Sequence, residues 1–317
     1  MRQRAFLPLH RSVGEIAVAL DGSLAPASHA TIAADLRRAR SLGVDVVDAT
    51  WASDHDTARL ALAEAFPSPV DRPTILFPVD HPVGSVPRDA AVPDAGPPPP
   101  GRADPPDHLL PGARHVAMIV DPGPDLSRTS EVVVRLERAR IDGKVGAWGV
   151  GWRDSASARA GVRAAVEAGA RVLDLPFNLL DPSALTEHLG WLQGRGACVV
   201  VHDPFADGRL DGSLLRDGPL RFHGPPRVAA IDELHRRFDG VTQLGFLTAA
   251  HGRTLAQAGL QVALRWPVVA TVAVPLAAPD LLASYTHLEQ VPELTEEEWA
   301  RWAGTVGGST NTAAGVP

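Results

Sequence analysis

Histidine, aspartate and tryptophan residues stand at or just beyond the points where short apolar runs of this sequence end. Among them, His202, Asp48, Asp121 and Asp203 are candidate catalytic residues. Histidine titrates near neutral pH and can act as a general acid or base, and a neighbouring carboxylate can orient its ring. We expect His202 to matter most, with Asp203 or Asp121 as the orienting carboxylate. Side chains that could contact a substrate are Trp51, His55, Asp80, His81, Trp152, Asn178 and Phe205.

Each of these residues also has a purely structural interpretation. Aspartates at strand ends often cap loops, His202 could be a satisfied core histidine, and an Asn such as Asn178 is a common structural choice at a strand end. Other chemistries have less support. No HxH or HExxH pairing is present, so we expect no metal site. No serine lies in the nucleophile-elbow context of a hydrolase.

The elements that must position these residues follow from the apolar pattern. Parallel strands covered on both faces read as continuous apolar runs, and a (β/α)8 TIM barrel needs eight of them. In such a barrel the carboxyl ends of the strands meet at one mouth, where barrel enzymes place their chemistry. We therefore expect a small-molecule ligand at that mouth. The eight predicted strands are residues 16–20, 44–49, 74–79, 115–120, 145–150, 172–175, 198–202 and 269–274.

Amphipathic segments fill most of the gaps between these runs, and one gap is different. The ten prolines of residues 82–111 exclude an ordinary helix, so we predict that a Pro/Gly-rich loop, residues 82–112, replaces the third helix. Residues 1–304 are predicted to form one domain and residues 305–317 a flexible tail. The predicted helices are residues 28–42, 55–66, 127–141, 155–168, 182–193, 254–265 and 295–302.

Composition narrows the class of protein. The net charge is −7 and arginine forms no basic stripe, which argues against a nucleic-acid partner. No stretch reaches 18 apolar residues, so we expect no membrane partner. Cys198 is the single cysteine, which excludes a disulfide within the chain and fits a cytoplasmic location.

Five segments, in this order along the chain, resemble the aldo-keto reductase family. They are ARSLGVDVVDA (39–49), GKVGAWGV (143–150), LPFNLLD (175–181), VHDPFADGRLDG (201–212) and HGRTLAQAGLQVALRW (251–266). The resemblance extends over about residues 11–302. It implies a TIM barrel that transfers hydride from NADPH to a carbonyl, with a tyrosine as proton donor and an Asp, a Lys and a His that tune it.

The catalytic residues that the resemblance implies are largely missing. Asp48 matches the Asp, but no tyrosine follows it. The Lys should end the third strand and the His the fourth, where residues 77–80 and 120–122 supply neither. The only lysine, Lys144, precedes the fifth strand, and the only tyrosine, Tyr285, follows the eighth. No shift of alignment brings either residue into the tetrad.

The cofactor site that the resemblance implies is altered as well. Gly151 and Trp152 replace the Ser-Asn pair that binds the carboxamide, and His202 replaces the tyrosine that stacks on the nicotinamide. Residues 275–285 contain no cation for a 2′-phosphate, and Asn178 alone survives. No GxGxxG follows a strand. We therefore expect no cofactor.

Three functional hypotheses remain open. The first is a cofactor-independent acid–base enzyme that cyclises, eliminates or isomerises a small organic compound, such as a secondary metabolite. The alternative is a non-catalytic pseudoenzyme that binds a small molecule or a protein partner, and the third is an atypical NADPH-dependent oxidoreductase. A missing third helix would leave strands three and four uncovered outside, which predicts a homo-oligomer or a protein partner there.

Overall fold

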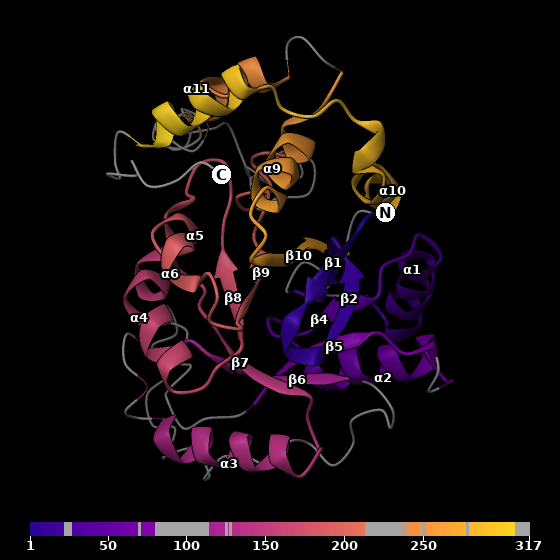
Figure 1. Ribbon diagram of the computed structural model, residues 1–317. Helices are drawn as coiled ribbons and strands as arrows, with labels where there is room; N and C mark the ends of the chain where they lie inside the picture. The colour runs from indigo at the N-terminus through magenta and orange to yellow at the C-terminus, as the bar shows by residue number, and fades with distance from the viewer. Residues whose placement is uncertain are drawn as a thin grey trace, which may run out of the picture.

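Eight parallel strands form a closed barrel, which confirms the predicted TIM-barrel fold (Figure 1). Their order around the barrel is β10-β3-β4-β5-β6-β7-β8-β9, so each strand pairs with its successor along the chain and the last with the first. The computed structural model describes residues 1–21, 27–68, 71–79, 114–123, 126, 129–212, 238, 240–248, 252–276 and 279–307. The barrel strands are β3 (Ile16–Ala19), β4 (Val46–Asp48), β5 (Thr74–Pro78), β6 (His115–Val120), β7 (Ala147–Gly151), β8 (Val172–Pro176), β9 (Cys198–His202) and β10 (Val269–Pro275).

Helices surround the barrel, and polar side chains fix where several of them begin. Ser28, Asp54 and Asp154 each accept a hydrogen bond from a backbone N–H of the first turn. Thr254 forms a capping box with Gln257. The helices are α1 (His29–Ser41), α2 (His55–Ala65), α3 (Ser130–Ile141), α4 (Ser155–Glu167), α5 (Ser183–Thr186), α6 (Leu189–Leu192), α9 (Leu255–Leu264), α10 (Pro279–Thr286) and α11 (Glu296–Gly307), with 3-10 turns at η1 (Leu7–Leu9), η5 (Gly245–Leu247) and η6 (Leu288–Gln290).

Two predicted helices differ from the structure. The predicted helix 182–193 is divided into α5 and α6 by a turn at Glu187 and His188. The last helix, α11, continues to Gly307 and so includes the first residues of the predicted tail. The predicted proline-rich loop 82–112 and residues 308–317 lie outside the described residues.

An N-terminal hairpin, which the sequence did not predict, covers the amino end of the barrel. Strand β1 (Gln3–Phe6) pairs antiparallel with β2 (Arg11–Gly14). Phe6, Leu9 and Val13 are buried in one cluster with residues of the barrel interior. The guanidinium of Arg4 donates to the carbonyl oxygens of Val269 at 2.7 Å and Trp266 at 2.8 Å, which attaches the hairpin to β10.

Side chains along each barrel strand alternate between the barrel interior and the outer face beneath the helices. Side chains such as Val172 and Val200 point into the barrel, whereas Trp148 and Leu173 point outward under the helices. Gly149 stands where β7 and β8 approach closely, because a Cβ there would lie 2.2 Å from the carbonyl oxygen of Val172. The close approach of β7 and β8 therefore leaves no room for a side chain at position 149.

The outer faces of strands three and four, here β5 and β6, are covered within a single chain. Ile75, Phe77 and Ile119 point outward and are all buried. The expectation that this apolar face is uncovered is therefore wrong for these residues. A partner near β5 and β6 stays a prediction, and an uncovered face no longer supports it. No helix among the described residues is long and apolar enough to span a membrane.

Candidate active site at the carboxyl end of the barrel

A buried carboxylate–imidazole pair lies at the carboxyl ends of two neighbouring strands. His202 is the last residue of β9, and Asp174 lies two residues before the end of β8. The imidazole Nδ1 lies 2.8 Å from Asp174 Oδ1. The Asp174 side chain is fully buried and that of His202 is 10% exposed. Because a carboxylate only accepts, Nδ1 carries the proton of this hydrogen bond and Nε2 is left for other chemistry.

Trp51, from the loop after β4, completes this pair. Its indole Nε1 donates to Asp174 Oδ2 at 2.6 Å, so both carboxylate oxygens are bonded. Its ring lies against the His202 imidazole, with the centroids 5.1 Å apart and the planes tilted by 50°. Gly151 provides the space, since a Cβ there would be 3.2 Å from the Trp51 ring and 3.3 Å from Asp174 Oδ2. Residues of β7, β8 and β9 and of the loop after β4 therefore hold the Asp174–His202 pair in place.

Asp48, the last residue of β4, is a third buried titratable group of this site. Its Oδ1 accepts the backbone N–H of Thr50 at 2.9 Å, whereas its Oδ2 has no hydrogen-bond partner within the described structure. Burial, and next the negative charge of Asp174, raise the pKa of Asp48 to about 7, against the opposing effects of Thr50 and His202. This carboxyl group can therefore hold a proton at neutral pH.

Burial and the neighbouring carboxylates shift the pKa of His202 in opposite directions. Burial lowers its pKa, but the charge of Asp174, the hydrogen bond to Asp174, and the charges of Asp48 and Asp203 outweigh burial and raise it. Its Nε2 is buried and has no hydrogen-bond partner within the described structure. An imidazole with one nitrogen fixed and the other unoccupied can accept a proton through Nε2 and later return it.

Asp203, predicted to orient His202, is instead used inside its own loop. Its Oδ1 accepts the backbone N–H of Asp207 at 2.7 Å, and its Oδ2 accepts from Asn178 Nδ2 at 3.3 Å. Burial raises the pKa of Asp203 to about 6. Asn178 in turn accepts the N–H groups of Leu180 and Asp181 through Oδ1. Both residues hold the loops after β8 and β9, which favours their structural interpretation, and the prediction that Asp203 orients the imidazole is wrong.

Asp121 lies at the rim of the mouth. Its Oδ1 accepts the backbone N–H of Arg153 at 2.8 Å, and its Oδ2 lies 3.9 Å from Arg153 Nε. The Arg153 guanidinium is centred 4.9 Å from the Trp51 ring. Asp121 thus positions a cation over Trp51, and no contact joins it to His202 among the described residues.

Three predicted substrate-binding residues have side chains in surroundings other than the Asp174–His202 pair. Trp152 is fully buried and faces α4, where a Cβ on Gly161 would meet its ring at 2.6 Å. Its predicted place in the pocket is wrong, because the residue after inward-facing Gly151 points outward. Phe205 is buried with its ring 5.0 Å from that of Tyr285. His55 is exposed at the start of α2. Predicted residues Asp80 and His81 lie outside the described residues.

Asp174 is the residue that the sequence analysis missed. It stands inside the predicted strand 172–175 as its only charged residue, and a charge in a strand covered on both faces is costly unless it is paired. This isolated charge is the feature of the sequence from which Asp174 could have been identified as a site residue. No cluster of three or more potential ligand side chains placed to hold a metal ion is found in the part of the chain that the structure describes.

Comparisons with known proteins agree with the barrel. No protein-family model matches the chain, and no curated protein matches its sequence. Among solved structures, it is similar to an aldo-keto reductase from Bacillus halodurans in its holo form (15% identity, 96% of each chain covered, TM-score 0.69). It is also similar to an aldo-keto reductase from Klebsiella pneumoniae in complex with NADPH (17% identity, 96% of each chain, TM-score 0.64) and with NADP and acetate (18%, 96% of each chain, TM-score 0.62). The chain therefore has the aldo-keto reductase fold.

Proposed function

We propose that the protein is a divergent member of the aldo-keto reductase family that no longer reduces carbonyls with NADPH. In this proposal it is a cofactor-independent acid–base enzyme that cyclises, eliminates or isomerises a small organic substrate. The observation that carries the proposal is the buried Asp174–His202 pair, whose Nε2 has no hydrogen-bond partner among the described residues, beside an Asp48 that can hold a proton near neutral pH. Acid–base enzymes commonly contain two titratable groups whose surroundings shift their pKa values apart.

The reaction divides between a base and an acid. His202 Nε2 takes a proton from a carbon next to a carbonyl, or from a hydroxyl group, and Asp174 stabilises the imidazolium that forms. Asp48 gives its proton to the developing oxyanion or leaving oxygen. In an isomerisation, His202 returns its proton to the substrate and Asp48 recovers its own, so the enzyme ends unchanged. One such positioned acid or base contributes about 10²–10⁴-fold in rate.

The residues present do not fit a nicotinamide cofactor. The resemblance would place the nicotinamide against the flat face at position 202, but Trp51 already lies against that imidazole. The resemblance would place carboxamide donors at 151 and 152, but Gly151 has no side chain and Trp152 faces α4 with its Nε1 donating to the carbonyl of Gly123. The proposed reaction therefore uses no NADPH.

The two other hypotheses each have one supporting observation. The atoms proposed to react, His202 Nε2 and Asp48 Oδ2, are both buried, which favours a non-catalytic binding protein. The fold is shared with reductases solved in complex with NADPH and NADP, which favours an oxidoreductase. Neither observation accounts for a carboxylate–imidazole pair whose second nitrogen has no partner in the described part of the chain.

Solvent deuterium exchange tests the proposed function without knowledge of the natural substrate. A panel of small ketones and β-hydroxyketones is incubated with the protein in D2O, and loss of the proton next to the carbonyl is followed by NMR. We expect exchange without added cofactor on at least one class of compound. His202→Asn should remove it, whereas the matched surface change His29→Asn on α1 should not. Exchange that persists in His202→Asn, or carbonyl reduction with NADPH, would overturn the proposal.

A further inference from the structure

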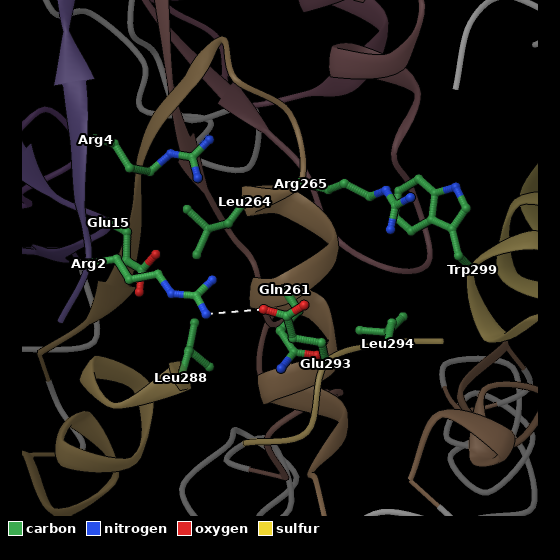
Figure 2. Close-up of a pocket in the computed structure, with 10 residues that line it drawn as sticks. All are labelled: Arg2, Arg4, Glu15, Gln261, Leu264, Arg265, Leu288, Glu293, Leu294 and Trp299. Atoms are coloured by element: carbon green, nitrogen blue, oxygen red, sulfur yellow. Dashed lines mark hydrogen bonds and ion pairs between the residues drawn. The ribbon is translucent and has the colours of Figure 1, made fainter. Parts of the chain in front are cut away.

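A polar pocket of about 170 Å³ lies at the amino end of the barrel, away from the buried carboxylate–imidazole pair (Figure 2). Strand β1 contributes Arg4, the residue before β3 is Glu15, and the last turns of α9 contribute Gln261 and Leu264. Its volume is more than ten times the roughly 10–15 Å³ that one water molecule requires. The pocket can therefore hold a small organic molecule.

Two buried acceptors in this pocket lack donors. Glu15 is 3% exposed, and its Oε1 has no hydrogen-bond partner among the described residues. The same holds for Gln261 Oε1, whose Nε2 is already committed to the carbonyl of Pro292 at 3.1 Å. Buried acceptors are normally satisfied, and an unsatisfied one is costly. The ionised Glu15 carboxylate and the Gln261 amide oxygen both accept, so they call for a ligand with N–H groups. The carboxyl end of α9 adds partial negative charge on the same side.

Positive charges line the same pocket. The guanidinium of Arg4 is held by two backbone carbonyls, through Nε and Nη2. That of Arg2 lies 3.1 Å from Glu293 Oε1, as the dashed line in Figure 2 shows. A simple cation would meet these two arginines, and a simple anion would meet Glu15. A ligand that carries both charges complements the pocket better than either.

The remaining wall is apolar. Leu264, Leu288 and Leu294 line the pocket, and the first two are buried. We propose that the pocket binds a small aliphatic zwitterion, a free α-amino acid of about the size of leucine. Its ammonium lies at Glu15 and Gln261, its carboxylate faces Arg2 and Arg4, and its side chain lies against the leucines.

Binding measured by calorimetry and by saturation-transfer NMR tests this assignment on the full chain. The probes are L-leucine, 4-methylpentanoate, which lacks the amine, and 3-methylbutylamine, which lacks the carboxylate. We expect saturable binding of L-leucine and at least tenfold weaker binding of both analogues. Glu15→Gln, which preserves shape, should weaken L-leucine binding at least tenfold. The surface change Arg37→Gln on α1 is the matched control and should not alter it.

Several outcomes would overturn the proposal. They are no saturable binding, which would mean that water fills the pocket, an analogue that binds as tightly as L-leucine, and full affinity in Glu15→Gln. If Glu15→Gln fails to fold, Arg2→Gln serves instead, because the Arg2 side chain is 60% exposed. That change should weaken L-leucine binding but leave 3-methylbutylamine unaffected, and equal loss for both would reject the assigned orientation. His202→Asn should bind L-leucine normally, which separates this proposal from the proposed function.

Discussion

Replacing Asp48 by asparagine should stabilise the protein more at alkaline than at acidic pH. Burial and Asp174 raise the pKa of Asp48 from 3.8 to about 7. The folded state therefore keeps a proton that the unfolded chain releases, and the stability that Asp48 contributes is lost as pH rises from the unfolded to the folded pKa. Asparagine keeps an oxygen for the N–H of Thr50 and has no charge to bury.

The two pKa values fix the size of this effect. With 1.36 kcal/mol per pKa unit, the energetic cost of Asp48 is about 2 kcal/mol at pH 5 and about 4 kcal/mol at pH 8. The difference in unfolding free energy between Asp48→Asn and the natural protein should therefore widen by about 2–3 kcal/mol between these pH values. Costs of fitting the amide into the site do not depend on pH and cancel.

Urea denaturation of both proteins between pH 5 and pH 8 measures this difference. Asp54→Asn is the control, because Asp54 is an exposed helix cap whose pKa is lowered by hydrogen bonds from Thr57. It stays ionised over this range, so its difference from the natural protein should remain constant. A difference for Asp48→Asn that stays constant or narrows as pH rises would refute the reasoning, because it would mean that Asp48 is ionised at pH 5.

Three more changes test the site and its surroundings. His202→Asn keeps a donor for Asp174 and should leave the thermal midpoint nearly unchanged while it lowers any exchange activity by about 10²–10⁴-fold; a large fall in the midpoint would indicate a core histidine. Trp51→Phe removes one donor from Asp174, so NMR titration should show a higher pKa for His202, and a lower pKa would contradict the assigned hydrogen bond. Arg253→Met should lower the unfolding free energy by about 3–5 kcal/mol in urea, because it removes a buried guanidinium that pairs with Glu298 and donates to the carbonyls of Leu247 and Pro292; a loss near zero would contradict this. Fluorescence titration with NADPH should show no micromolar binding, and saturation with carbonyl reduction would reject the non-redox proposal.

The barrel could be predicted from sequence because each strand is covered on both faces and so appears as an apolar, β-branched run. The hairpin β1–β2 could not, because Phe6, Leu9 and Val13 follow no regular period and are buried only against the finished barrel. The division between α5 and α6 could not be predicted either, because it depends on a contact with another helix. The His188 ring contacts the carbonyl of Arg159 in another helix, and no local pattern shows that contact.

The site was predicted in part, and the alternation of side chains along a strand explains the errors. In β7 the inward positions are 147, 149 and 151, so Trp152 points outward although it stands just beyond a strand end. In β8 the same alternation brings Asp174 inward with Val172. The sequence showed which residues end the strands, as for His202 and Asp48. Which face each residue occupies depends on the register between strands, which the sequence alone does not define.

The barrel closes through contacts between residues that lie far apart along the chain. Strand β3, near the amino end, is completed by β10, and Arg4 is held by carbonyls 262 and 265 residues further along. The ribosome therefore makes all the strands from β3 to β9 before β3 can pair with β10. A chain that stops before β10 has two unpaired edges, on β3 and β9, of the kind that recruit other chains. We expect nascent or truncated chains to need chaperones, and early stop mutations to produce aggregates rather than partly active fragments.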